Sequence, residues 1–429
     1  MNKSTQFIRI ISTGWWCRNW LLDIRVLTLW VHRISRIPLF ICAVPIVLII
    51  RLIKPWVLVR LDVLISPRLG HFSANTELYL CEQDAGINRP HQRYIDIFCI
   101  TKPVCNQQLA LMWKRVLRIW PSWVVSPILR INGWIPGGKS HQINVHNTFG
   151  RDIHNLYDEY PPHLKFTEKE TALGEKSLEA MGVPSGAQFI CLNVRDSAYL
   201  ADHGPSDWAE HNYRDSDIKN YILVSESLAD RGYFVIRMGA KVHKTLNSLH
   251  PRVIDYATEG SRNEFMDIYL GAKCLFCIST GSGWDGVPEI FRRPIVYVNY
   301  APIGYLCSFR ENTISILRHH VSSSLGRRLS LSEIFICNVG FSLSATDYKI
   351  RGIDLVENSP EEICDAAIEM LERLNGSWRT SAFDNVLQQQ FWKIYTTHVM
   401  NSHLKKPLHG KIRARFGTSF LLNNQEWLQ

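Results

Sequence analysis

From residue 57 onward, short apolar runs alternate with segments of helical periodicity, and this alternation restricts the fold more than any other feature. Apolar runs predict buried strands at residues 57–65, 94–100, 189–194, 234–238, 274–279 and 294–299. Helical spacing predicts helices at residues 74–83, 106–120, 217–231, 263–272 and 359–374. Strands that alternate with helices form parallel sheets covered by helices. The sequence therefore predicts an α/β protein with two doubly wound domains and C-terminal helices.

Stretches rich in Pro, Gly and polar residues lie between some of these elements and suggest where the domains end. The Pro- and Gly-rich stretch at 134–138 and the polar run to residue 162 indicate a linker. A capping-box pattern at Thr167–Glu170 then starts a new helix. We expect four parts: a membrane-associating segment at 1–56, an N-terminal domain at 57–165, a second α/β domain at 166–356 and C-terminal helices at 357–429.

The net charge of +9 is concentrated at the N-terminus. Residues 1–60 hold nine basic residues and one acidic residue, whereas basic and acidic residues nearly balance in the rest of the chain. A nucleic-acid-binding body would carry its own basic excess. We therefore expect no nucleic-acid partner.

The segment at 1–56 combines that charge with tryptophans and one apolar run. The run at 37–50 is fourteen residues long, short of the ~20 that a membrane-spanning helix needs. Tryptophans and arginines are interleaved around it, as is typical of a membrane interface: Trp15, Trp16, Trp20, Trp30 and Trp56. We expect peripheral or monotopic attachment to the cytoplasmic face of a membrane. A hairpin buried against the body and a true span are the alternatives.

The eleven cysteines indicate reduced thiols rather than disulfides. Their number is odd, and most of them lie in apolar runs without clustered spacing. The one Cys-x-x-C motif, Cys274–Cys277, lies inside a predicted strand and lacks a second pair. We expect core thiols there.

A glycine-rich loop follows the predicted strand at 274–279. Thr280, Gly281, Ser282 and Gly283 lie between this strand and a short helix, where backbone N–H groups can approach a phosphate. Glu289 follows about two turns later, in reach of a sugar hydroxyl. The alternative is a tight turn capped by its own Ser and Thr side chains.

Two further strands end in arginine. Arg195 is followed by Asp196, and Arg237 is followed by Met238 and Gly239. An arginine at the mouth of a buried strand needs an anion or a carboxylate, and its planar fork suits a diphosphate. The two loops that carry these arginines and the glycine-rich loop at 280–283 would together form one cationic pocket. Structural Arg–Asp pairs are the alternative.

Asp215 and Asp217 have the Asp-x-Asp spacing with which some glycosyltransferases hold Mn²⁺. They directly precede a predicted helix, where Asp and Ser are favoured caps, so we expect no metal. His71, after Gly70 in the first strand-to-helix turn, is a candidate general base because histidine titrates near neutrality. Asp196 is the rival base.

Several blocks resemble a family of glycosyltransferases encoded with bacterial surface-polysaccharide genes. They include RLGHFSANTELYL, CLNVRDSAYL, HNYRDSDIKNY, GYFVIRMG, NEFMDIYLGAKCLFCISTGSG and IRARFGTSFL, and together they cover roughly residues 55–425. The resemblance implies a GT-B fold, with two Rossmann-like domains facing a cleft. It also implies donor recognition by Arg195, Arg214, Arg237 and residues 280–283, with Arg68, Gly70 and His71 on the facing domain.

The expected activity is transfer of a sugar from a nucleotide-activated donor to a surface-glycan acceptor, which we expect to be lipid-linked. The expected chemistry needs no metal or other cofactor, because arginines would stabilise the leaving diphosphate. Two alternatives stay open: another nucleotide-sugar enzyme on the same fold, such as an epimerase, and a non-catalytic scaffold of polysaccharide assembly.

Overall fold

The computed structural model describes residues 37–145, 150–198, 208–402 and 407–429. Positions 1–36 of the expected membrane-associating segment lie outside this description. The chain forms two compact units. Of the described residues, unit 1 comprises 37–63, 90–100 and 117–144, and unit 2 comprises 64–89, 101–116 and those from 145 onward. This grouping differs from the expected boundaries at 57, 166 and 357, which stay predictions about independent domains.

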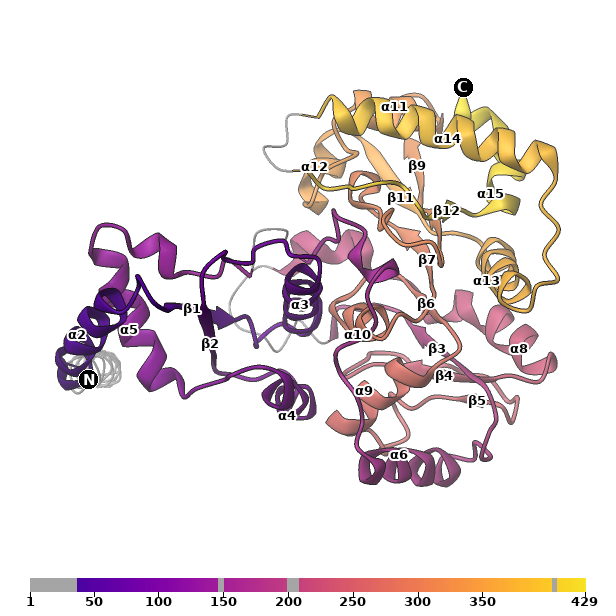
Figure 1. The fold of residues 1–429 in the computed structure, drawn as a ribbon. Coiled ribbons are helices and arrows are strands. Elements are labelled where there is room, and N and C mark those ends of the chain that lie inside the picture. The colour runs from indigo at the N-terminus through magenta and orange to yellow at the C-terminus, as the bar shows by residue number, and fades with distance from the viewer. Residues whose placement is uncertain (1–36, 146–149, 199–207, 403–406) are drawn as a thin grey trace, which may run out of the picture. The chain divides into compact units, whose positions relative to one another are not determined.

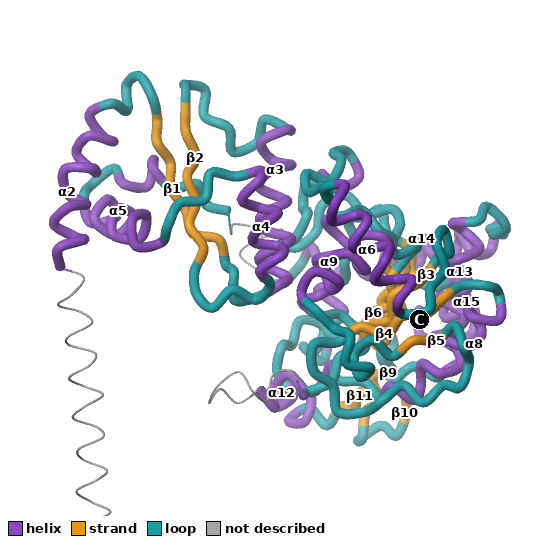
Figure 2. Tube along the Cα trace, turned by 90° about the horizontal axis from the view of Figure 1, so that it is seen from below, coloured by secondary structure: helices purple, strands orange, loops and turns teal. Residues whose placement is uncertain are grey.

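Unit 1 is a two-stranded sheet packed by two helices. Strands β1 (Leu58–Leu64, its last residue counted with unit 2) and β2 (Tyr94–Ile100) pair with each other. Helices α2 (Ile37–Leu52) and α5 (Ser122–Trp134) lie side by side in Figures 1 and 2. Their shared core is Ala43, Val47, Val59, Leu61, Ile97, Cys99, Val125, Ile128 and Ile131.

The doubly wound sheet expected for residues 57–165 is therefore wrong in extent. Among the described residues of unit 1 only β1 and β2 are strands, and single parallel bridges flank them at Gln142 and Ile119. The apolar runs that could have extended the sheet form α2 and α5 instead. No helix of the described chain is long and apolar enough to cross a membrane.

Unit 2 is built on a seven-stranded sheet, as the alternation predicts. Its order is β12-β8-β7-β6-β3-β4-β5, and every pairing in it is parallel. The strands are β3 (Phe189–Asn193), β4 (Phe234–Met238), β5 (Val253–Ile254), β6 (Cys277–Ser279), β7 (Ile295–Tyr300), β8 (Thr313–Leu317) and β12 (Arg415–Phe416). The chain starts at β3, runs outward to β5 and returns to β6, so the order reverses between β3 and β6.

Helices cover both faces of this sheet (Figure 1) because its strands alternate their side chains between two cores. Ile190 and Leu192 pack with α8 (Ile222–Asp230), α13 (Pro360–Leu374) and α14 (Ala382–Met400). Phe189 and Cys191 pack on the other face with α9 (Glu264–Lys273). The remaining helices that the structure describes in unit 2 are α3 (Thr76–Asp84), α4 (Gln107–Val116), α6 (Glu168–Ala180), α10 (Gly286–Ile290), α11 (Leu331–Ile336), α12 (Ala345–Ile350) and α15 (Thr418–Asn423).

Three further features belong to unit 2. Strands β10 (Arg327–Arg328), β9 (His319–Ser322) and β11 (Ile353–Val356) form a small antiparallel sheet. The cysteines that the structure describes are free thiols, and Cys274 and Cys277 are buried in the core, as predicted. The predicted capping box is also present, since Thr167 and Glu170 cap the start of α6 reciprocally.

Candidate functional site

The strand order of unit 2 indicates where a ligand can bind. In open parallel sheets, ligands lie beyond the carboxyl ends of the strands, at the point where the strand order reverses. Here that point lies between β3 and β6, whose last residues Asn193 and Ser279 are register partners. The loops that follow them are two of those singled out from the sequence.

A buried hydrogen-bond network shapes these two loops. The amide nitrogen Nδ2 of Asn193 lies 2.7 Å from Ser282 Oγ, 2.8 Å from Asp285 Oδ1 and 3.3 Å from Ser279 Oγ. Asp285 also accepts hydrogen bonds from Ser279 Oγ at 2.6 Å and from the Ser282 N–H at 2.7 Å. Burial raises the pKa of Asp285 to about 6, although the Ser279, Ser282 and Asn193 hydrogen bonds oppose the rise. Asn193 therefore joins the two loops.

The glycine loop satisfies most of its own donors. The N–H of Thr280 donates to Asn193 O, that of Gly281 to Ser279 Oγ, that of Ser282 to Asp285, and that of Trp284 to Ser282 Oγ. Gly281 also needs its left-handed backbone (φ +85°), which favours glycine. These contacts are those of the capped tight turn considered as the alternative to a phosphate cradle. The binding of a phosphate at this loop would thus depend mainly on side chains and less on backbone N–H groups.

Cationic side chains gather at the same place. The Arg195 side chain is 9% exposed and lies 3.4 Å from Asp215, yet its Nη1 and Nη2 have no hydrogen-bond partner among the residues that the structure describes. Burial, and then neighbouring Arg214, lower the pKa of Arg195 to about 10, and Asp215 opposes this change. Burial, then Arg214, Arg195 and Arg68, lower the pKa of His211. Arg68, Arg195 and Arg214 therefore form one group next to His211, and we call these three arginines the cation cluster.

Arg237 is engaged differently from Arg195. It is 1% exposed, and its Nη1 donates to Asp255 Oδ2 at 3.0 Å and to the Lys244 carbonyl at 2.6 Å. These contacts match the structural Arg–Asp pair considered as the alternative. A Cβ on Gly239 would lie 2.6 Å from Val242 Cγ1, so close packing explains this glycine without a ligand.

The candidate carboxylates also have protein partners. Asp196 accepts the Ala198 N–H on one oxygen and the His243 N–H on the other. Asp217 caps the 3-10 turn Ile218–Tyr221 and pairs with Lys244 at 2.9 Å, as expected for a cap. The role of Asp196 as a base stays a prediction.

A cavity of about 270 Å³ lies at the ends of β3 and β4. Its walls mix carboxylates with cations, and its lining includes Asp196, Asp215, Asp217, Arg237, Lys244 and Glu357. Such a wall offers hydrogen-bond acceptors and donors to a hydroxyl-rich group.

The segment expected on a facing domain belongs to the same compact unit as the glycine loop. A Cβ on Gly70 would lie 3.1 Å from the Cα and the carbonyl oxygen of Gly283. His71 is the next residue and begins the π-helical turn His71–Asn75; its side chain is partly exposed. The candidate base is thus adjacent in sequence to a residue that touches the loop.

Glu289 is buried on α10, with 8% of its surface exposed. Burial raises its pKa to about 7, and Arg310 opposes the rise. Its proposed contact with a sugar hydroxyl stays a prediction.

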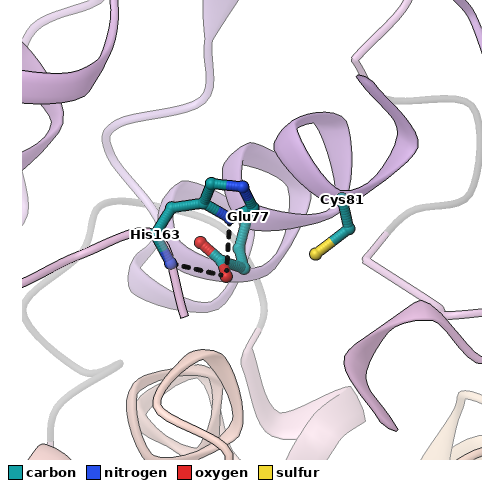
Figure 3. Close-up of side chains that lie close together, drawn as sticks. All are labelled: Glu77, Cys81 and His163. Atoms are coloured by element: carbon teal, nitrogen blue, oxygen red, sulfur yellow. Dashed lines mark hydrogen bonds and ion pairs between the residues drawn. The ribbon is translucent and has the colours of Figure 1, made fainter. Parts of the chain in front are cut away.

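One cluster elsewhere in unit 2 has the composition of a metal site. Glu77, Cys81 and His163 offer ligand atoms within 4.8 Å of one another (Figure 3). However, Arg292 Nη2 lies 2.7 Å from Glu77 Oε1 and 3.4 Å from Cys81 Sγ. Burial, and then Glu77, raise the pKa of the Cys81 thiol to about 12. The Arg292 guanidinium already supplies the positive charge in this cluster. The side chains of Glu77, Cys81 and His163 therefore do not suit a metal ion.

Sequence reasoning missed His211 and the supporting role of Asn193. His211 lies three residues before Arg214 in the block HNYR, and this spacing was the available signal. Nothing local to Asn193 indicates its partners, because they lie 86 to 92 residues away.

No family model matches the chain, and no curated protein matches its sequence. Solved structures do resemble it. The Escherichia coli ADP-heptose lipopolysaccharide heptosyltransferase II is 14% identical, over 74% of this chain and 99% of its own, with a TM-score of 0.39. A glycosyl transferase family 9 protein from Veillonella parvula is 12% identical, over 73% and 97%, with a TM-score of 0.42. E. coli heptosyltransferase WaaC is 12% identical, over 68% and 97%, with a TM-score of 0.31.

Proposed function

We propose that this protein is a glycosyltransferase that moves a sugar from a nucleotide-activated donor to a lipid-linked glycan at the cytoplasmic face of the bacterial inner membrane. The observation that carries the proposal is the buried guanidinium of Arg195 beside Arg214, because neither terminal nitrogen has a hydrogen-bond partner in the described part of the chain. It lies next to the reversal of strand order, where α/β sheets bind ligands.

A buried cation beside a like charge is unfavourable unless an anion approaches it. The 3.4 Å ion pair with Asp215 does not satisfy Nη1 or Nη2. A diphosphate would supply the missing acceptors in the bidentate geometry that guanidinium groups favour. The neighbouring cavity, lined by carboxylates, would accommodate hydroxyl groups of the same donor.

The same side chains would act in transfer. The acceptor hydroxyl oxygen forms a bond to the anomeric carbon while the bond from that carbon to the diphosphate breaks. Arg195 and Arg214 would stabilise the charge that develops on the leaving diphosphate, which is the role a divalent metal would otherwise have. The proton of the acceptor hydroxyl would pass to His71. Asp196 is less suited, since both its oxygens accept backbone N–H groups.

Thermal-shift measurements with UDP, GDP, CDP, ADP and CMP, with and without EDTA, test the donor site. A ligand at a hundredfold excess over its Kd stabilises the folded state by about 2.7 kcal/mol. We expect one nucleotide to raise Tm and the shift to survive EDTA. Arg195→Gln should weaken the binding of that nucleotide by about 10- to 100-fold, since a hydrogen bond to a charged group contributes about 1.5–3 kcal/mol.

Arg327→Gln is the matched control, because Arg327 is exposed and pairs with Glu333 at the surface. It should leave nucleotide affinity unchanged. A nucleotide shift that needs a divalent cation would contradict the metal-free chemistry. Equal nucleotide affinity of the Arg195→Gln variant and the parent protein would show that the cation cluster is not the donor site.

A further inference from the structure

Helix α2 exposes most of its apolar surface. Its one charged residue is Arg51, and it buries Ala43 and Val47. The side chains at 37, 41, 44 and 48 are spaced to form one stripe along the helix, and all four are exposed, by 51%, 65%, 41% and 57%. Leaving such a stripe in water is unfavourable.

Helix α5 continues this surface with tryptophans that lie outside the segment expected to meet a membrane. Trp123 is 64% exposed and Trp134 is 70% exposed. They are eleven residues apart, which places them on the same face of the helix. Trp134 stacks on Phe40 of α2, with ring centroids 6.4 Å apart and planes at 12°. The tryptophan face of α5 therefore borders α2.

The two helices are fixed to each other. The Arg51 guanidinium donates to Asn132 Oδ1 and to the carbonyls of Asn132, Ile135 and Pro136. Arg130 lies over the Phe40 ring, 5.6 Å from its centroid. The exposed surface is thus one pre-formed patch, which we call the α2–α5 face.

Unit 1 also holds the excess positive charge of the described residues. Its described part contains seven basic and two acidic residues, a net charge of +5. The described residues of unit 2 contain 33 basic and 34 acidic residues, a net charge of −1. A second copy of unit 1 would bring like charges together, whereas an anionic lipid surface is complementary to this charge.

We infer that the α2–α5 face docks on an anionic lipid bilayer, with Trp123 and Trp134 at the interface beside the apolar stripe of α2. Tryptophan favours the headgroup level, and basic side chains favour anionic headgroups. Since Ala43 and Val47 belong to the core of unit 1, α2 meets the bilayer along one side. The inference deepens the proposed function, because it names the surface that would bring the enzyme to a lipid-linked acceptor.

Sedimentation of the full chain with vesicles tests the inference. Vesicles of phosphatidylcholine that contain a minor share of phosphatidylglycerol should bind the protein, and binding should fall with salt and be weak on pure phosphatidylcholine. Trp123→Ser, and separately the pair Ile41→Ser and Leu48→Ser, should each lower the partition coefficient at least fivefold. The control pair, Leu249→Ser and Ile350→Ser, changes exposed apolar residues of unit 2 and should bind like the parent.

The nucleotide thermal shift is measured on every variant, so loss of fold and loss of donor binding are seen separately. Vesicle binding without any nucleotide shift would support the α2–α5 face and count against the proposed function. Parent-like vesicle binding by both face variants would overturn the inference. A parent that dimerises in sedimentation velocity without lipid, and whose face variants are monomers, would also overturn it in favour of a second copy.

Discussion

The backbones of Gly70 and Gly283 lie against each other, so that a Cβ on Gly70 would come within 3.1 Å of the Cα and the carbonyl oxygen of Gly283. Residue 70 follows β1, whereas residue 283 follows β6, in a distant part of the sequence. Two glycines let the segment that carries His71 approach the loop at the reversal of strand order. A Cβ on Gly70 would force the two backbones apart, whereas a Cβ on Gly283 would lie at an ordinary contact distance, 3.4 Å from Gly70 N.

Substituting Gly70 by Ala tests this contact. The neighbour is backbone and yields little, so we expect a loss of about 1–3 kcal/mol in the free energy of unfolding and weaker nucleotide binding. Urea denaturation and the nucleotide thermal shift measure the two effects. Gly133→Ala is the control, since a Cβ there meets nothing within 4 Å; in α5 it should be neutral or slightly stabilising. A neutral Gly70→Ala would show that the two segments separate freely.

Replacing Asn193 by Ala should loosen the glycine loop. The substitution removes the amide that joins Ser282 and Asp285, and it leaves a buried carboxylate with one donor fewer. We expect a loss of about 1–3 kcal/mol in stability, together with reduced nucleotide affinity. Asn247→Ala, in an exposed loop, is the control and should change neither quantity. Unchanged nucleotide affinity in Asn193→Ala would mean that the loop geometry does not depend on this network.

The carboxyl of Glu289 should make stability fall as pH rises. Its folded pKa of about 7 is raised by burial above an unfolded value of about 4.3, so the folded protein binds the proton more tightly. The group therefore favours the fold below about pH 4, and this contribution is lost as pH rises through about 7. Glu289→Gln should stabilise the protein at pH 8, by about 1–3 kcal/mol, and the difference should shrink toward pH 4.

Glu179→Gln, on the exposed surface of α6, supplies the comparison and should show no such trend. Chemical denaturation at pH 4, 6 and 8 gives the free energies of unfolding. If Glu289→Gln destabilises most at pH 8, the ionised Glu289 has a favourable partner, and the burial argument fails.

Breaking the pair between Glu77 and Arg292 should be costly. The Glu77 side chain is fully buried, 2.7 Å from Arg292, and Glu77→Gln leaves that cation without its partner. We expect a loss of about 3–5 kcal/mol. Glu333→Gln breaks the exposed pair with Arg327 and should cost about 0.2–1 kcal/mol.

The same cluster predicts indifference to metals. EDTA should leave the Tm of the parent protein unchanged, and added Zn²⁺ should not raise it, because Arg292 occupies the position between Glu77 and Cys81. A Zn²⁺-dependent rise in Tm that Cys81→Ser removes would instead establish a metal site here.

Local patterns in the sequence were sufficient for four strands of the main sheet of unit 2, namely β3, β4, β6 and β7, whereas β8 was not predicted. The strand at 234–238 and the helix start at Thr167 agree with the structure, as does the strand at 94–100 in unit 1, because periodicity and capping are properties of neighbouring residues. The short strands β5 and β12, two residues each, were missed since nothing in so short a run distinguishes it from a loop.

The candidate site likewise has features that are local in the sequence and features that depend on contacts between distant residues. By itself the sequence determined that arginines end two buried strands and that a glycine-rich turn follows a third, because strand ends are local features. Only the tertiary structure decided that Arg237 is neutralised by Asp255, whereas two nitrogens of Arg195, beside Arg214, lack a partner within the described ranges. It also decided that Gly70 meets Gly283, and that α2 and α5 share one exposed face. Charge compensation and close contact depend on residues that folding brings together from distant parts of the chain, and no spacing along the sequence records those distances.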